Sequence, residues 1–214
     1  MAEVGLAERL QRRAERAGLP LAPAPAARLA AYVALLLRWN ERVNLTALGG
    51  DDRGLDRLVL EPLLAARRIP RGAGALVDIG SGGGSPAIPI RIARPRLFVR
   101  MVEARVRKAA FLREAVRQLK LDGVVVERCR YEELLDRAEL RGAHDVLTIR
   151  GVRVDERAAS ALEGLVRAGG TLLFFGGAAG RVNDGFAARG EAERGEGAGR
   201  VGASGLVVVR KGGA

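Results

Sequence analysis

One stretch, Ala75-Leu-Val-Asp-Ile-Gly-Ser-Gly-Gly-Gly-Ser-Pro-Ala-Ile-Pro-Ile90, constrains the fold more than any other part of this 214-residue chain. Its apolar run Ala75 to Ile79 predicts a short strand buried on both faces, because such strands lose the alternation of half-exposed ones. The glycines that follow can adopt positive φ and let a ligand approach the main chain. Ser85 and Pro86 are typical of an N-cap and a first helical residue. The stretch therefore predicts a strand, a glycine turn and a helix that together form a nucleotide-type pocket.

Two kinds of ligand fit the glycine spacing. The acidic glycine turn of S-adenosylmethionine (SAM) methyltransferases matches Asp78-x-Gly80-x-Gly82-x-Gly84, and the dinucleotide fingerprint matches Gly82-x-Gly84-x-x-Ala87. Asp78 favours SAM, because a carboxylate there would repel a pyrophosphate but can lie near a cationic ligand. The dinucleotide match also begins three residues after the strand, although it should open directly from it. We therefore expect a SAM site that includes Asp78, Gly80, Ser81, Gly82, Gly84 and Ser85.

Strands and helices alternate after this stretch, which is typical of an α/β fold with a mostly parallel sheet. The further strands are expected at Leu97 to Val102, Val124 to Glu127, Asp145 to Ile149, Thr171 to Phe175 and Leu206 to Arg210, the last of them antiparallel. Helices are expected at 86–94, 105–120 and 155–167, the last with Ala168-Gly169-Gly170 as its C-cap. The composition of 176–205, rich in Gly, Ala, Arg and Glu, does not favour an ordered structure.

A helical extension is predicted over residues 1–70 and a second domain over 71–214, and the linker Pro70 to Gly74 leads into the central strand. Helical periodicity covers 3–17, 23–40 and 53–68, and in the third helix either Pro62 makes a kink or Glu61-Pro62 starts a new turn. Trp39-Asn-Glu-Arg-Val-Asn-Leu-Thr46 mixes a large aromatic residue with two asparagines. That run predicts a shaped corner rather than a solvent loop.

Polar residues follow the carboxyl ends of the predicted strands, where open α/β sheets bind ligands. Glu103 comes about 20 residues after the glycine turn, where a carboxylate commonly holds ribose hydroxyls. Dinucleotide enzymes share this placement, so Glu103 supports an adenosyl ligand without distinguishing SAM from NAD. Cys129-Arg130-Tyr131-Glu132 should line the adenine side, and Arg150-Gly151 reaches the same rim.

The charge of the chain suits a polyanionic partner such as RNA. The net charge is +11 and the pI about 11.2, although a GC-rich genome would also enrich arginine. Arg107 and Lys108 are candidate phosphate contacts, or alternatively part of a solvated helix face. Aromatic residues make up 4%, which argues against broad stacking platforms for single strands.

The sequence predicts a cytoplasmic protein without a metal site. No apolar run approaches the ~20 residues of a membrane span, and the first residues contain no signal-peptide core. The single cysteine, Cys129, fits a reducing compartment, and we interpret it as a small apolar filler. His144, the one histidine, is expected to be structural or exposed.

Several of these motifs, in this order, resemble the bacterial small-subunit ribosomal RNA guanine-N7 methyltransferase family known as RsmG or GidB. The resemblance runs from about Leu29 to Lys211. The motifs that carry it are Trp39 to Thr46, Asp78 to Pro89, Glu103 with Arg107-Lys108 and Phe111-Leu112, Arg130-Tyr131-Glu132, and Arg150-Gly151-Val152. It implies a Rossmann-like methyltransferase domain with a seven-stranded sheet, SAM as methyl donor, and a guanine of 16S rRNA or the 30S subunit as acceptor.

By resemblance, Gly80 and Ser85 would contact the amino-acid and sulfonium end of SAM, and Tyr131 and Glu132 its adenine. Arg130 is a further candidate for cofactor binding. Arg150 would lie between cofactor and base, and Arg107 and Lys108 would meet RNA phosphates. Arg150 can orient guanine through O6 and leave N7 free, or alternatively pair with a carboxylate such as Glu132. N7 has a free lone pair, so no general base is required. We expect the protein to act as a monomer.

The chain departs from the family pattern at several positions. Ser85 replaces a bulky apolar residue, Ala87 a glycine and Gly151 an alanine, Gly176 stands where the family often has lysine, and a His-x-x-Asp-Ser segment appears as Leu58, Glu61 and Pro62. Two rival functions therefore remain open. One is a non-catalytic RNA-binding or assembly protein on a methyltransferase fold, and the other is an NAD-linked oxidoreductase.

Overall fold

The computed structural model of the chain describes residues 2–176, 192–194 and 205–212. One sheet in the order β3-β2-β1-β4-β5-β7-β6 forms its centre. The strands are β1 (Ala75–Ile79), β2 (Phe98–Val102), β3 (Val124–Glu127), β4 (His144–Arg150), β5 (Val166–Phe175), β6 (Ala192–Arg194) and β7 (Leu206–Arg210). The first five run parallel, and β7 runs antiparallel to β5. The predicted fold class is confirmed, with the three-residue β6 as an edge strand beyond the six others.

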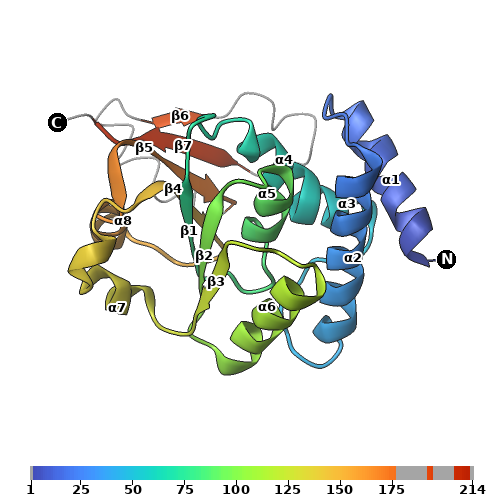
Figure 1. Cartoon of the computed structure of the whole chain (residues 1–214), viewed down its shortest axis with the longest axis horizontal. Coiled ribbons are helices and arrows are strands. Elements are labelled where there is room, and N and C mark those ends of the chain that lie inside the picture. Colours follow the sequence, from blue (N-terminus) through green and yellow to red (C-terminus); the bar gives the residue numbers. More distant parts are fainter. Residues whose placement is uncertain (1, 177–191, 195–204, 213–214) are drawn as a thin grey trace.

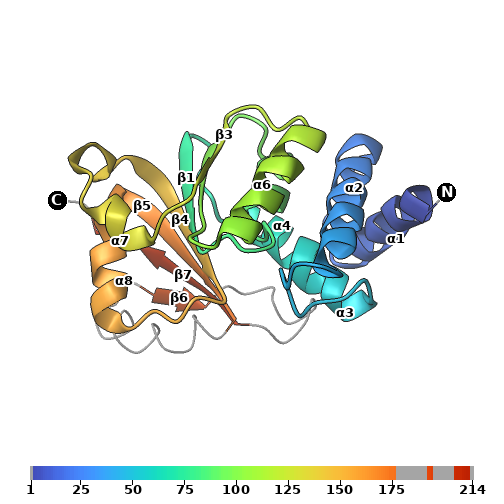
Figure 2. The same cartoon turned by 90° about the horizontal axis from the view of Figure 1, so that it is seen from below.

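Helices cover both faces of the sheet. On one face lie α7 (Tyr131–Leu135), the 3₁₀ turn η2 (Ala138–Leu140) and α8 (Glu156–Glu163), and on the other lie α4 (Glu61–Ala66), α5 (Ala87–Ala93) and α6 (Val106–Gln118) (Figures 1 and 2). Leu76 packs into the hydrophobic cluster on the α5 side, and Val77 and Ile79 pack into the cluster on the α8 side. The central strand is therefore buried on both faces, as its unbroken apolar run predicts.

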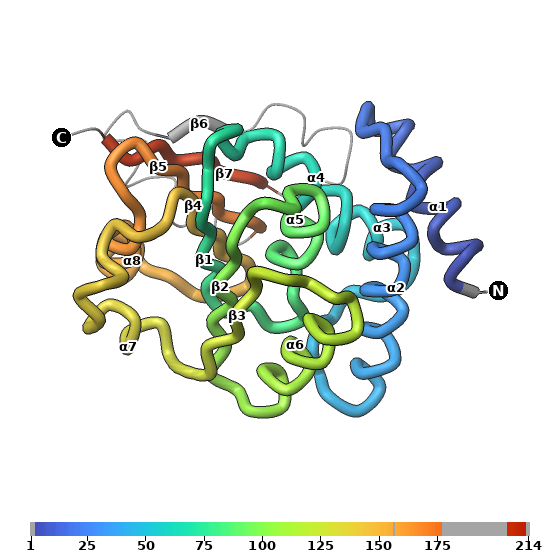
Figure 3. The backbone as a smooth tube through the Cα atoms, viewed as in Figure 1, coloured from blue at the N-terminus to red at the C-terminus, as the bar shows by residue number. Residues whose placement is uncertain are grey.

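The N-terminal helices extend the α5 and α6 side of the molecule. They are α1 (Ala2–Arg16), α2 (Pro23–Asn40) and α3 (Asp52–Leu55), followed by the π-helical turn η1 (Asp56–Leu60). Figure 3 shows α1 at one end of the molecule and α7 and α8 at the other. Because α2 packs on α5 and α6 within the same hydrophobic cluster as the sheet, it supports the site directly. The division into 1–70 and 71–214 stays a prediction.

Several boundaries differ from the sequence prediction, and β5 starts at Val166 rather than at Thr171. In the helix expected at 53–68, α4 starts at Glu61-Pro62 after the π turn, which is one of the two alternatives left open for Pro62, and it ends at Ala66 rather than at 68. The helix expected at 155–167 ends at Glu163, so Ala168-Gly169-Gly170 is not its C-cap. The diglycine belongs to β5 instead, where Gly169 N–H donates to the carbonyl of Lys211 and the Lys211 N–H donates to that of Gly170.

Most of the run 176–205 lies outside the described residues, and within it β6 is described as a strand. None of the helices in the described part of the chain has the length and apolar composition needed to cross a bilayer.

Candidate active site

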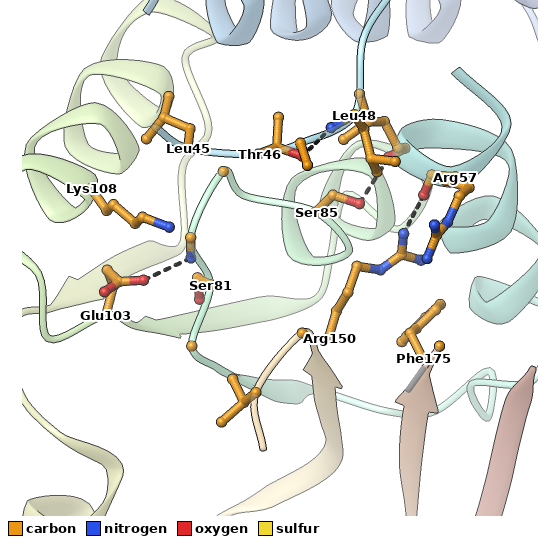
Figure 4. Close-up of a pocket in the computed structure, with 18 of the residues that line it drawn as sticks. Leu45, Thr46, Leu48, Arg57, Ser81, Ser85, Glu103, Lys108, Arg150 and Phe175 are labelled. Carbon is orange, nitrogen blue, oxygen red and sulfur yellow. Dashed lines mark hydrogen bonds between the residues drawn. The ribbon is translucent and has the colours of Figure 1, made fainter. Parts of the chain in front are cut away.

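A cavity of about 590 Å³ opens where the carboxyl ends of the central strands meet the helical extension. It is lined by the glycine turn after β1, the residues that end β2, β4 and β5, the loop 45–48, and Arg57 and Leu58 of η1 (Figure 4). Ligands in open α/β sheets bind at this edge. The predicted residues Gly80, Ser81, Gly82, Ser85, Glu103, Lys108 and Arg150 all lie in its lining.

The glycine turn is held in shape by hydrogen bonds to the neighbouring strand. Gly80, Gly82 and Gly84 have φ values of 69°, 51° and 85°, which favour glycine. The Gly82 N–H donates to Oε2 of Glu103 at 3.0 Å, and the Arg105 N–H donates to Oε1 at 2.8 Å. A carboxylate offers about four lone-pair sites, so Glu103 keeps acceptor capacity for a ligand.

The helical extension shapes the other side of the turn. The hydroxyl of Tyr32 donates to the Gly83 carbonyl, and Oδ1 of Asn40 accepts from the N–H groups of Leu45 and Thr46. The Asn40 amide also donates to the Thr46 carbonyl at 3.0 Å. The run from Trp39 to Thr46 is therefore a shaped corner, as predicted. The role of Tyr32 was not predicted, because nothing in the sequence distinguishes its hydroxyl from that of any core tyrosine.

A second cavity of about 300 Å³ adjoins the first, and Gly80, Glu103, Arg105 and Val152 line both. Its remaining wall includes the run from Cys129 to Glu132, which the sequence assigned to the adenine side of a ligand. Glu103 thus lies at the junction of two lobes. This arrangement suits an elongated ligand with a sugar in its middle.

Two predicted residues, Asp78 and Gly84, support the site without lining its cavities. Asp78 lines neither cavity: its side chain is 1% exposed, Thr148 Oγ1 donates to its Oδ1 at 2.6 Å, and Oδ2 has no hydrogen-bond partner among the described residues. Burial raises the pKa of Asp78 to about 6, while the bond from Thr148 lowers it. Gly84 also lies outside both linings, and a Cβ there would be 2.5 Å from Cδ1 of Ile88, so the turn requires glycine at this position. Ser81 donates its hydroxyl to the Asp78 carbonyl.

Ser85 does not cap α5, and this expectation was wrong. The N-cap position is Pro86, and the Ser85 hydroxyl donates to the carbonyl of Leu58 at 2.9 Å. Local sequence alone favours a cap, because serine is common at that position. In the structure the hydroxyl instead donates to a main-chain carbonyl of η1, 27 residues earlier in the chain.

Arg150 is held at the far wall by several contacts. Its guanidinium lies 2.9 Å from Oε2 of Glu61, donates to the carbonyl of Arg57, and lies over the Phe175 ring at 4.5 Å. Its carboxylate partner is therefore Glu61 and not Glu132. Burial lowers the pKa of Arg150, and the charge of Glu61 raises it.

The cavity is strongly basic. Among the described residues of its lining, Glu103 is the single carboxylate, and Arg57, Arg105, Lys108 and Arg150 are cations. Arg107 lies outside the lining, exposed on α6. Arg57 and Arg105 were missed, because no local pattern separates them from the other arginines of this chain. The one histidine is structural, since His144 is buried with Nδ1 3.1 Å from the Leu165 carbonyl, and Cys129 is buried with a raised thiol pKa.

Solved structures share the fold. The cofactor-bound Rv0187 from MTB has a TM-score of 0.62 at 19% identity and covers 86% of this chain and 91% of its own. The O-methyltransferase TomG from Streptomyces achromogenes, solved in complex with SAM, has a TM-score of 0.60 at 17% identity and covers 85% and 90%. At these identities the likeness concerns the fold alone.

Sequence comparison identifies the family. The ribosomal RNA small subunit methyltransferase G of Syntrophotalea carbinolica is 39% identical over 67% of this chain and 65% of its own length. The protein of the same description from Stenotrophomonas maltophilia strain K279a is 42% identical over 75% and 68%. The match thus spans slightly less than two thirds of the first of these relatives. Residues 26–184 match the family model described as rRNA small subunit methyltransferase G, and the chain therefore belongs to this GidB family.

Proposed function

We propose that this chain transfers a methyl group from SAM to N7 of a guanine in 16S rRNA, acting in the cytoplasm as a monomer on the RNA or the 30S subunit. The observation that carries the proposal is the two-lobed cavity with Glu103 at its junction and cations at its far wall. One lobe suits a nucleoside, and the basic lobe suits an RNA acceptor. Family membership supports the same reaction.

The residues of the site fit SAM. In this proposal Arg130, Tyr131 and Glu132 line the adenine lobe, and Glu103 accepts from the ribose hydroxyls. The turn from Gly80 to Gly83 gives the amino-acid end a main-chain surface without Cβ atoms. SAM supplies an electrophilic methyl group on a sulfonium cation. The single carboxylate of the larger lobe, Glu103, lies at the end of the cavity that this cation would favour.

The acceptor lobe requires orientation rather than proton transfer. Guanine N7 attacks through its lone pair, and among the described residues no histidine lines either lobe. Orientation alone can contribute several kcal/mol to rate acceleration. Arg150 has five N–H groups, two of which are engaged by Glu61 and Arg57. We propose that a remaining one faces guanine O6 and leaves N7 free.

Mass-spectrometric mapping of methylguanosine in 16S rRNA tests this function. Cells that lack the protein should lose one N7-methylguanosine, and purified protein with SAM should restore it on rRNA or 30S subunits from those cells. Titration with SAM, S-adenosylhomocysteine (SAH) and NAD should show tight binding of the first two only. If SAM binds but no RNA form is methylated, the chain is a non-catalytic RNA-binding protein. Tight NAD binding would instead indicate an oxidoreductase.

A further inference from the structure

Two guanidinium groups lie side by side at the Phe175 end of the cavity, those of Arg57 and Arg150 (Figure 4). Both groups are cations and repel each other, so the charge of Arg57 adds to burial in lowering the pKa of Arg150. Like charges are held this close only if opposite charges compensate them. The contacts of each arginine therefore decide whether a further anion is needed.

Arg150 is already compensated. It forms an ion pair with Glu61 at 2.9 Å and donates to the Arg57 carbonyl, and its side chain is 13% exposed. The Phe175 ring supports the guanidinium from one side at 4.5 Å. These contacts fix Arg150 as part of the wall of the cavity.

Arg57 is not compensated in this way. Its guanidinium forms no hydrogen bond or ion pair with any residue that the structure describes, and its Nε is buried without a partner. Nη2 lies 3.5 Å from the position that a Cβ of Gly176 would occupy, so this arginine lies against the residue that follows β5. Nε is the one donor of this guanidinium that is buried without a partner among the described residues, and the Nη groups, which make no bond there either, are available to a ligand.

We propose that Arg57 binds a backbone phosphate of the RNA beside the target guanine, while Arg150 holds the Arg57 main chain in place. The assignment rests on the proposed RNA substrate. A guanidinium matches two phosphate oxygens through parallel N–H groups. The carboxylate of the methyl donor is the alternative anion. This carboxylate is less suited to pair with Arg57. The sulfonium of the same molecule is attracted to Glu103 and repelled by the two arginines, and Glu103 lies on the opposite side of the cavity from both arginines (Figure 4).

The test compares Arg57→Gln and Arg57→Lys with Arg157→Gln, which removes an equal charge from an exposed position on α8. Binding of unmethylated 16S rRNA is measured from 50 to 300 mM salt, and SAH binding is measured by calorimetry. We expect Arg57→Gln to weaken RNA binding about tenfold and to reduce the slope of log affinity against log salt by about one. Arg57→Lys should keep the slope, and Arg157→Gln should behave as wild type. SAH affinity should stay within threefold, and melting temperatures show whether each variant is folded.

Three results would overturn the assignment. Equal RNA affinity and slope for Arg57→Gln and Arg157→Gln would remove the phosphate contact. A tenfold loss of SAH affinity with unchanged RNA binding would assign Arg57 to the carboxylate of the methyl donor. If Arg57→Gln loses RNA binding and Arg57→Lys does not restore the wild-type slope of log affinity against log salt, Arg57 has a structural role. If wild-type protein binds SAH but neither binds nor methylates 16S rRNA, the proposed function fails. If wild-type protein methylates 16S rRNA and Arg57→Gln binds RNA as wild type does, only the assignment of Arg57 is rejected.

Discussion

The hydroxyl group of Tyr32 donates a hydrogen bond of 2.7 Å to the carbonyl oxygen of Gly83, 51 residues later in the chain. Tyr32 is 0% exposed, and burial raises its pKa strongly, so the hydroxyl stays protonated and remains a donor. Helix α2 thereby fixes the middle of the glycine turn. The N-terminal helices thus help to shape the glycine wall of the cavity and do not only cover the sheet.

Tyr32→Phe is expected to lower the free energy of unfolding by about 1–2 kcal/mol, because it leaves a partly buried carbonyl without its hydroxyl donor. The ring stays in the core, so this loss reports on the hydrogen bond rather than on packing. SAH affinity should fall a few fold as the turn loosens. Urea unfolding and calorimetric titration measure the two effects. Unchanged SAH affinity in a destabilised variant would show that the turn keeps its shape without Tyr32.

Gly80→Ala and Gly151→Ala separate backbone strain from steric conflict at the site. Both glycines have φ near 70°, which costs alanine about 1–2 kcal/mol. A Cβ at Gly80 would lie 2.2 Å from Cγ2 of Val152, whereas no atom lies within 4 Å of one at Gly151.

Gly80→Ala should therefore cost about 2–5 kcal/mol in unfolding free energy, the strain plus overpacking, and weaken SAH binding at least tenfold, because Val152 lines both lobes. Gly151→Ala should lose only the strain energy and bind SAH within threefold. Adding Val152→Ala to Gly80→Ala should recover part of the stability. Equal costs for the two alanine variants would exclude the steric explanation.

Local sequence predicted the strands and the glycine turn well, because continuous apolar runs such as Ala75 to Ile79 can be satisfied only inside a covered sheet. It failed where a distant partner decides the structure. The Ser85 hydroxyl bonds to Leu58 instead of capping α5, and Gly169 and Gly170 pair with the end of β7 instead of ending α8. Arg57 could not be found for the same reason: its position beside Arg150 depends on packing between η1 and the end of β4.

Arg150→Met is expected to remove methyl transfer while SAH affinity stays within a few fold, because the proposed function places Arg150 on the acceptor side of the cavity. The fold should also lose about 3 kcal/mol, since a buried cation that compensates Glu61 disappears. Glu61→Gln alone should cost less, because the amide oxygen still accepts from the guanidinium.

Single-turnover methylation and urea unfolding of both variants and of the double variant measure these effects. The double-mutant cycle should give a coupling energy above about 1 kcal/mol. Equal loss of SAH binding and turnover in Arg150→Met would reassign this residue to the cofactor.

The buried carboxyl group of Asp78 makes stability depend on pH in a direction opposite to that of most carboxylates. Its pKa is raised from the ordinary value of 3.8 to about 6, because burial disfavours the charged form. Below about pH 4 the group is protonated in both states, and between pH 4 and 6 the folded state retains a proton that the unfolded state releases. Its contribution to stability is therefore lost as pH rises through 6, by up to roughly 3 kcal/mol.

Asp78→Asn cannot titrate, and its amide oxygen can still accept from Thr148. Urea unfolding at pH 4, 5, 6 and 7 should show Asp78→Asn gaining stability relative to wild type as pH rises, whereas parallel curves would show that the carboxyl group ionises in the folded protein as readily as in water.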